Sequence, residues 1–309
     1  MTAADGAEPR LGAPVLGAYL LLIVPPLCWA GNFVVGRAVH AEVPPAALTF
    51  WRWAVAAAVL LPVAGLDAWR AREAIRRQWP LLTVLALTGV VGFQFVVYQG
   101  LHSTTAINGV LIIATIPAVI PAIAYALDGE RITLRQGLGI LLSTLGVAVI
   151  VLRGDLAAAL ALDVAAGDLW IATAVPMWAL YSVLVRRKAE ALPPLALLLA
   201  IVGIGLVVLA PGYALELATI GGFAPTPAAF AAIAYVGIAA SVLAFWCWNR
   251  GIAGVGASKA GLYLHLMPVF AALLAVLFLG ERLYAYHGVG MALVASGLFL
   301  SSTAGGRSR

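Results

Sequence analysis

Polar and aromatic side chains that could bind a small molecule recur inside long apolar stretches of this 309-residue chain. Trp29 and Asn32 share one face of one stretch, and Thr104, Asn108 and Thr115 follow at helical spacings in another. Hydrogen bonds from such groups, together with stacking on such rings, can hold a solute that has a polar end and an aromatic part.

Further residues of this kind lie in four other apolar stretches. They are Gln94, Tyr98, Trp178, Tyr181, Trp246, Asn249, Tyr263 and His265. Any one of them could simply form a hydrogen bond between helices, but together they predict a moderately polar, aromatic substrate pathway. His265 is the one mid-helix group expected to titrate near neutral pH, either as a packed histidine or as a proton carrier.

Covalent and metal chemistry find no support in the chain. The histidines at 40, 102, 265 and 287 lack metal-ligand spacing, and GIAGVGASK at 251–259 lacks the order of a phosphate loop. No nucleophile–base arrangement is evident, so we expect no catalytic residue, no metal and no cofactor. All acidic residues fall in loops, tails or helix ends, which argues against a proton-driven cation antiporter.

The composition indicates that lipid surrounds these stretches. The chain is 63% apolar and 10% charged, whereas soluble domains carry about a quarter charged residues. A membrane-crossing helix needs about 20 apolar residues. We therefore predict an all-α integral membrane protein with ten transmembrane helices, at 13–38, 44–64, 80–101, 103–127, 134–152, 167–187, 194–214, 228–249, 253–279 and 284–303. The charged segment 65–79 is predicted to form a short interfacial helix.

The basic residues predict the orientation, because they favour the cytoplasmic side. With both termini cytoplasmic, only Arg37, Arg153 and Arg282 would lie in loops on the opposite side. The net charge of +5 sits in such short loops, so we expect no nucleic-acid partner. The expected partners are the bilayer and a small-molecule substrate; a monomer would suffice, and the sequence leaves the oligomeric state open.

The two halves of the chain repeat each other. An offset of 149 aligns Trp29 with Trp178, and an offset of 151 aligns Pro117 with Pro268 and the Gly-Glu-Arg triplet at 129–131 with that at 280–282. We divide the chain into five-helix repeats at 1–153 and 154–309. Because five is odd, the second repeat would enter the membrane inverted, which is a geometric basis for alternating access.

Several positions are predicted to be mechanical. Pro117 and Pro268 would kink the middle of their helices, either as gating hinges or as static bends. Arg52 lies about 12 Å from the nearer helix end, where an arginine costs about 2.5–3.5 kcal/mol. We expect it to serve structure or gating rather than to contact the substrate. Glu281, just before the tenth helix, is expected to anchor that helix's N-terminus.

Three segments carry a resemblance to a known family: CWAGNFVVGR at 28–37, IPAVIPAIAYALDGERIT at 116–133 and MPVFAALLAVLFLGERL at 267–283. They resemble the paired units of EamA-type drug/metabolite transporters, and the likeness extends over nearly the whole chain. Within that superfamily the chain is most similar to bacterial exporters of aromatic and other amino acids, the YddG type. The resemblance implies that helices 1, 3, 4, 6, 8 and 9 line the pathway.

These observations favour a bacterial inner-membrane exporter of amino acids, aromatic and other neutral or zwitterionic ones, that works by alternating access. An exporter of other metabolites or drugs is the first alternative. A membrane sensor or scaffold is the second.

Overall fold

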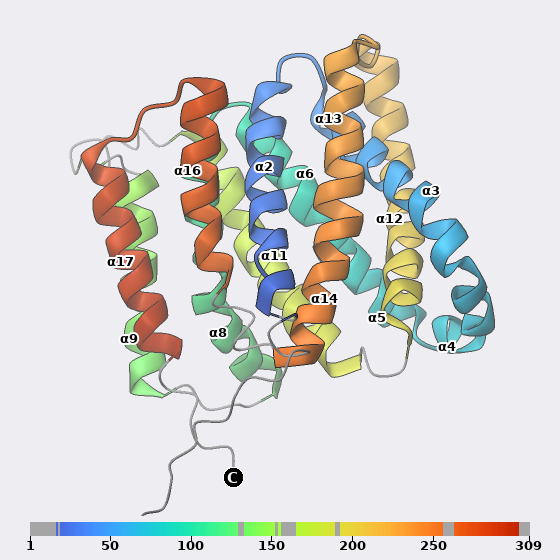
Figure 1. Cartoon of the computed structure of the whole chain (residues 1–309), viewed down its shortest axis with the longest axis horizontal. Coiled ribbons are helices and arrows are strands. Elements are labelled where there is room, and N and C mark those ends of the chain that lie inside the picture. The colour runs from blue at the N-terminus through green and yellow to red at the C-terminus, as the bar shows by residue number, and fades with distance from the viewer. Residues whose placement is uncertain are drawn as a thin grey trace, which may run out of the picture.

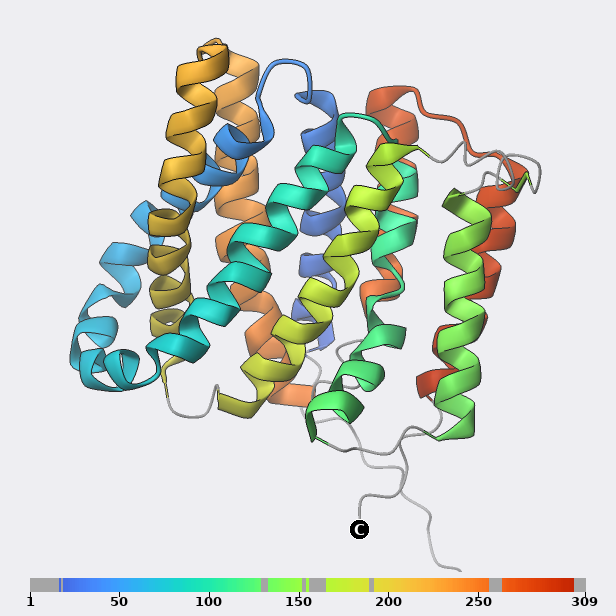
Figure 2. The same ribbon diagram turned by 180° about the vertical axis from the view of Figure 1, so that it is seen from behind.

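The computed structural model describes residues 17, 19–128, 133–151, 154–155, 165–188, 192–255 and 263–302. Throughout these residues the regular structure is helical, with no strand. The helices run side by side as one elongated bundle (Figure 1), and the view from behind shows the same arrangement (Figure 2). This confirms the predicted all-helical class.

The first half of the chain contains α2 (Val24–Ala38), α3 (Pro45–Arg70), α4 (Arg72–Arg77), α5 (Trp79–Leu85), the π-helix η1 (Ala86–Gly92), α6 (Phe93–Leu101), α7 (Ala106–Ile113), α8 (Ile116–Asp128) and α9 (Leu134–Val151). The second half contains α11 (Ala166–Lys188), α12 (Pro194–Ile220), α13 (Pro227–Gly237), the π-helix η3 (Ile238–Leu243), α14 (Ala244–Val255), the short 3₁₀-helix η4 (Tyr263–His265), α16 (Leu266–Leu279) and α17 (Ala285–Ser302).

Local signals fix where several helices begin. Pro45 and Pro194 occupy the first turns of α3 and α12, where a missing N–H has no cost. The hydroxyl of Thr105 accepts from the N–H of Asn108 and so caps α7, and Thr226 caps α13 in the same way. These boundaries lie within a few residues of the predicted runs.

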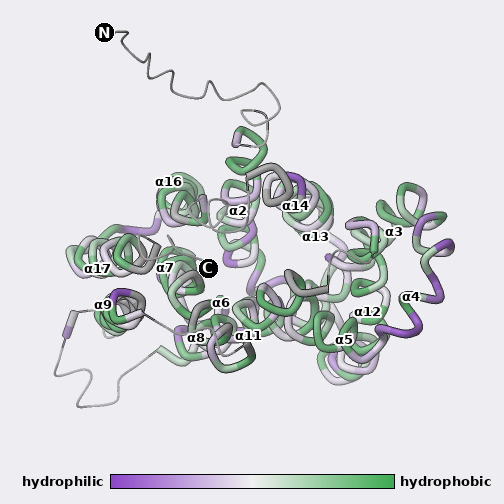
Figure 3. The backbone as a smooth tube through the Cα atoms, turned by 90° about the horizontal axis from the view of Figure 1, so that it is seen from below, coloured by the Kyte–Doolittle hydropathy of each residue, from purple (hydrophilic) through white to green (hydrophobic). Residues whose placement is uncertain are grey.

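Seven helices of the described chain are long and apolar enough to cross a membrane: Tyr19–Ala38, Pro45–Arg70, Trp79–Leu101, Ala106–Leu127, Ala166–Val185, Pro194–Ile220 and Pro227–Trp248. Gly137–Gly146 and Leu266–Leu279 are shorter apolar helices. The predicted interfacial helix at 65–79 is wrong in its bounds, because α3 continues to Arg70 and only α4 is separate. Figure 3 shows α4 as a hydrophilic segment at one edge of the bundle.

Two apolar runs are interrupted rather than kinked. Ala114 and Thr115 form a turn between α7 and α8, and Pro117 is the second residue of α8. Pro268 is the third residue of α16, directly after the 3₁₀ turn η4. The prediction of mid-helix prolines therefore needs correction, because each proline lies in the first turn of a helix, where proline is tolerated.

Helices from the two halves of the chain pack against each other in a regular pattern. α2 contacts α14 and α16, while α11 contacts α6, α7 and α8. α3 packs along α12, and α9 packs along α17 at one end of the bundle (Figures 1 and 3). The interior of the bundle is therefore built from both halves of the chain.

A glycine crossing joins α9 to α17. A Cβ atom added at Gly146 would lie 2.8 Å from the carbonyl oxygen of Gly290 and 2.9 Å from the backbone nitrogen of Val294. Gly146 and Gly290 therefore let the two helix backbones approach closely. Gly137, on the same helix, has no atom within 4 Å of such a Cβ.

We expect Gly146→Leu to lower the stability of the protein by about 1–3 kcal/mol, since the new side chain would force the two backbones apart. Thermal unfolding in detergent would measure the effect, with Gly137→Leu as the matched control on α9. Equal melting temperatures for the two variants would contradict the packing described.

Candidate functional site

The guanidinium of Arg52 lies at the centre of a buried hydrogen-bond network. Arg52 has 0% exposure, and its Nε donates to the hydroxyl oxygen of Ser241 at 2.6 Å. Its Nη1 lies 2.7 Å from Asn32 Oδ1 and 2.8 Å from Gln94 Oε1. Tyr98 accepts from the same nitrogen at 2.9 Å and donates its own proton to Asn32 Oδ1 at 2.6 Å. Four helical segments, α2, α3, α6 and η3, thus meet at one side chain.

Every acceptor in this network is neutral. No ion pair reaches Arg52 from the part of the chain that the structure describes; Arg70 and Asp67, which pair at 3.6 Å, are on the surface. The ring of Trp53 lies 5.1 Å from the guanidinium carbon and offers its negative face to the charge. The network therefore gives each nitrogen of the guanidinium at least one acceptor but leaves its positive charge without a balancing anion.

The two π-helical segments supply carbonyl acceptors to neighbouring helices. In η3 the carbonyl of Ala240 accepts from Trp29 Nε1 at 3.0 Å and from Arg52 Nη2 at 3.2 Å. In η1 the carbonyl of Val90 accepts from Trp53 Nε1 at 2.9 Å. Segments of π-helix inside α-helices often mark functional sites. Here they bind the polar edges of two buried tryptophans.

Aromatic rings gather beside the network. Trp29 and Trp178 meet edge to face, with centroids 6.0 Å apart, and both contact Phe245 at 5.9 Å. Phe93 and Tyr181 approach Trp178 at 4.8 and 5.1 Å. Three of these rings, Trp29, Phe93 and Trp178, line the inner cavity. This space of about 40 Å³ is also lined by Asn32, Phe33, Gln94, Ile113, Ala114, Ile116, Leu264 and Met267.

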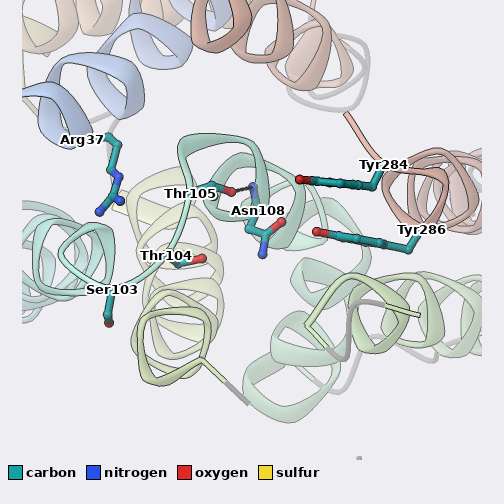
Figure 4. A pocket seen from close by; sticks show the side chains of 7 residues that line it. All are labelled: Arg37, Ser103, Thr104, Thr105, Asn108, Tyr284 and Tyr286. Atoms are coloured by element: carbon teal, nitrogen blue, oxygen red, sulfur yellow. Dashed lines mark hydrogen bonds between the residues drawn. The ribbon is translucent and has the colours of Figure 1, made fainter. Parts of the chain in front are cut away.

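A second and larger pocket, the rim pocket, is shown in Figure 4. Its volume is about 470 Å³, and it is lined by Arg37, Ser103, Thr104, Thr105, Asn108, Tyr284 and Tyr286. The rings of the two tyrosines stack nearly parallel, 5.6 Å apart, and project toward Asn108 (Figure 4). Because α2 and α7 each line both spaces, the rim pocket and the inner cavity define one axis through the bundle.

The charge at the rim pocket comes from Arg37. Its Nη1 donates to the carbonyl of Leu101 at 2.7 Å. The Nδ1 of His40 lies 2.6 Å from the carbonyl of Arg37, and the His40 and His102 rings are 5.6 Å apart. Partial burial, reinforced by His40 and Arg37, lowers the pKa of His102. The lowered pKa disfavours the charged form of His102, so the fixed positive charge at the rim pocket is that of Arg37.

A buried carboxylate lies behind the rim pocket. Asp168 in the first turn of α11 has 0% exposure and accepts from the hydroxyl of Thr104 and, at 3.3 Å, from Nδ2 of Asn108. The Oδ1 of Asn108 accepts in turn from Nε2 of His287 at 2.9 Å, because Nδ1 of that ring already accepts from the backbone of Tyr284. These bonds join α7, α11 and α17.

A close backbone approach positions this carboxylate. A Cβ atom at Gly167 would lie 2.3 Å from the carbonyl oxygen of Gly100. Only glycine fits at such a distance, so α6 and α11 cross here and bring Asp168 next to Thr104.

Two glutamates each bind the N-terminus of a helix that lies far from them in the sequence. Glu281 accepts from the N–H groups of Ala106 and Ile107 at 2.8 and 3.2 Å, so it anchors α7. The prediction that Glu281 anchors the N-terminus of the tenth helix is therefore wrong, because the helix that it anchors is α7. Glu216 accepts from the N–H groups of Ala46 and Ala47 at 3.0 and 2.6 Å, at the start of α3.

The structure brings most of the predicted pathway residues to this axis. Trp29, Asn32, Gln94 and Trp178 line the inner cavity, and Thr104 and Asn108 line the rim pocket. Tyr98 and Arg52 lie directly behind the inner cavity, and Tyr181 packs on Trp178. Thr115 is turned back on its own helix, since its hydroxyl donates to the carbonyl of Ile112 at 2.7 Å.

Other predicted residues lie elsewhere. Trp246 is 38% exposed and stacks with Arg250 at 5.7 Å, so it faces away from the cavity. Tyr263 stacks on Tyr19 with centroids 6.1 Å apart, outside both spaces. The side chains of Asn249, His265 and Pro117 are outside the described residues.

Sequence reasoning overlooked several residues of the site. Phe245 and Trp248 take the inward position that we assigned to Trp246, because the wide turns of η3 change which face of the following helix points inward. Asp168 falls at a helix end, as expected of an acidic residue, and its own position in the sequence did not indicate its burial. The pair of partners at positions 104 and 108, one helical turn apart, was the available signal.

A bundle of apolar helices that encloses a polar network and two hollows along one axis is the architecture of a multi-pass membrane transporter. The chain belongs to the EamA-like transporter family, whose sequence model matches residues 16–152 and 165–303. Members of that family are transporters, which supports a non-enzymatic role.

Individual relatives agree with this assignment. The chain is 28% identical over 295 residues to the uncharacterized transporter YyaM of Bacillus subtilis, covering 93% of this chain and 94% of that protein. It is 29% identical over 291 residues to a probable terminal-alkyne amino-acid exporter of Streptantibioticus cattleyicolor, covering 92% of each. A crystal structure of a protein that is 21% identical matches the fold with a TM-score of 0.62, over 96% of this chain and 100% of that one.

We expect Arg52→Met to destabilise the protein strongly. The substitution leaves the side-chain oxygen atoms of Gln94 and Ser241 as buried acceptors without their donor, at about 1–3 kcal/mol for each unsatisfied group. Arg76→Met, on the exposed face of α4, is the control. Comparison of melting temperatures in detergent checks the effect, and a drop no larger than that of the control would show that the network is not structural.

Proposed function

We propose that the protein exports amino acids, aromatic and other neutral or zwitterionic ones, across a bacterial inner membrane by alternating access. In this proposal, ten helices cross the membrane as two inverted five-helix repeats, residues 1–153 and 154–309, with both termini cytoplasmic. The observation that carries the proposal is the inner cavity, where paired tryptophans from the two halves meet beside a buried cation.

The helix contacts support an inverted repeat. Exchanging the two halves converts the contacts of α2 with α14 and α16 into those of α11 with α6, α7 and α8, and it converts the pairs α3–α12 and α9–α17 into themselves. The π-helical segments, at 86–92 and 238–243, and the helix breaks before Pro117 and Pro268 also recur in equivalent places. Such duplication lets one set of contacts close either side of a shared site.

The substrate class follows from the lining of the inner cavity. Indole and phenyl rings favour apolar or aromatic groups, while the amides of Asn32 and Gln94 provide polar contacts. The similarity to a probable terminal-alkyne amino-acid exporter supports an amino acid as the solute. A volume of about 40 Å³ is too small for an amino-acid side chain, so binding requires the surrounding helices to separate.

Arg52, Pro117 and Pro268 are the gating elements of the proposal. The two prolines lie in the first turns of α8 and α16, directly after a break in the helix, where a change in backbone angles can tilt these helices. Arg52 ties α3 to α2, α6 and η3, so movement of these helices must rearrange its bonds.

Export of other small metabolites or drugs is the first competing function, and the predominantly apolar lining of the inner cavity is compatible with it. A sensor or scaffold is the second competing function, and it would not use a cavity of this kind. A counterflow panel of amino acids, nucleosides and sugars in liposomes separates these functions.

We expect Trp29→Ala and Trp178→Ala to reduce counterflow of phenylalanine by about tenfold or more, because each removes a ring worth about 1–3 kcal/mol from the cavity wall. Trp246→Ala is the matched control, since it removes the same ring from the outward face of α14. Saturable counterflow of nucleosides or sugars, without any of amino acids, would contradict the proposed substrate.

A further inference from the structure

The side-chain amides of Asn32 and Gln94 are held in one orientation each. Both residues are 3% exposed, and both line the inner cavity. The oxygen atom of each amide accepts from Nη1 of Arg52, at 2.7 and 2.8 Å. Because a guanidinium has only donors, it can bind these amides only through their oxygen atoms. Arg52 therefore determines which end of each amide remains available for other hydrogen bonds.

The NH₂ ends of the two amides are left over. Among the residues that the structure describes, neither Asn32 Nδ2 nor Gln94 Nε2 has a hydrogen-bond partner, although buried amide groups are normally paired. Since the oxygen atoms face Arg52 behind the wall, the NH₂ groups are the polar atoms available to the cavity. This part of the cavity offers donors and no side-chain acceptor of its own.

The electrostatic potential at this wall of the inner cavity also favours a negative group. The charge of Arg52 is not balanced by a carboxylate of the described chain, and the apolar surroundings screen it weakly. A negative group in the inner cavity would gain both from the amide donors and from this charge. A positive group at the same place would meet neither an acceptor nor a favourable field.

We propose that Asn32 and Gln94 form a carboxylate subsite of the inner cavity, with Arg52 as the positioning residue that orients both amides and supplies the charge behind them. The subsite rests on the proposed function for the identity of its substrate, and it names the end of the solute that binds there. The aromatic part of the solute then lies against Trp178 and Phe93, which also line the cavity.

The size of the cavity is consistent with this division. A volume of about 40 Å³ holds about three water-sized groups, which matches a carboxylate but not an aromatic ring. The carboxylate can therefore enter the subsite as it stands, whereas the ring needs Trp29, Trp178 and Phe93 to move apart.

Two probes that share a phenylethyl group test the charge preference. Both 3-phenylpropionate and phenethylamine carry a phenyl ring on a two-carbon chain, but the first ends in a carboxylate and the second in an ammonium group. A ligand that binds the folded state raises the melting temperature, and at a given concentration the rise is larger for the ligand with the lower Kd. We expect the purified full-length protein to be stabilised by 3-phenylpropionate and not by phenethylamine at the same concentration.

Gln94→Glu tests the residues. The new side chain keeps an oxygen atom toward Arg52, so folding is preserved, but it replaces the NH₂ donor by an acceptor and neutralises the guanidinium. We expect the affinity for 3-phenylpropionate to fall by about tenfold or more, since a hydrogen bond to a charged group contributes about 1.5–3 kcal/mol. Gln78→Glu, between α4 and α5, introduces the same charge outside the cavity and should leave the affinity unchanged.

The outcomes separate this subsite from the proposed function. Equal stabilisation by the two probes, no stabilisation by 3-phenylpropionate, or an unchanged preference in Gln94→Glu would each overturn the subsite. Phenylalanine counterflow accompanied by any of these results would leave the proposed function standing without it. A clear preference for the carboxylate probe with no amino-acid counterflow would support the subsite and contradict amino-acid export.

Discussion

A guanidinium buried among apolar helices must find an acceptor for each of its donors, and this requirement organises the interior of the protein. Arg52 draws its acceptors from α2, α6 and η3, so that three helical segments are tied to α3 at one level of the bundle. The acceptors are neutral, and therefore the charge remains. A structural need of one residue thus creates an electropositive wall beside the cavity.

Other features of the interior follow from placing polar groups where water is absent. The π-helical segments offer carbonyl groups to the indole nitrogens of Trp29 and Trp53 as well as to the arginine. The rim pocket carries a second network, in which Asp168 and His287 are joined through one asparagine. Since α2 and α7 line both spaces, a shift of either helix would change both hollows at once.

Hydrophobicity alone predicted the helical class and most helix positions. An apolar run long enough to cross lipid must satisfy its backbone hydrogen bonds internally, and therefore it forms a helix. The polar and aromatic residues within those runs also predicted four residues that line the inner cavity, Trp29, Asn32, Gln94 and Trp178. The predictions were wrong where helices depart from regular α-helical geometry. Trp246 was expected to face the cavity, but η3 turns it outward. The breaks before Pro117 and Pro268 were expected to be kinks within continuous helices. Long-range contacts were also beyond reach, since the burial of Asp168 depends on a glycine crossing between distant segments.

The most direct measurement of this account is a map of the protein with bound phenylalanine, by crystallography or cryo-electron microscopy. The account predicts the carboxylate within hydrogen-bonding distance of the amide nitrogens of Asn32 and Gln94, the phenyl ring against Trp178, and Arg52 still bonded to both amide oxygen atoms. A ligand bound through its carboxylate at Arg37 in the rim pocket, or with its ammonium group against Asn32, would contradict it.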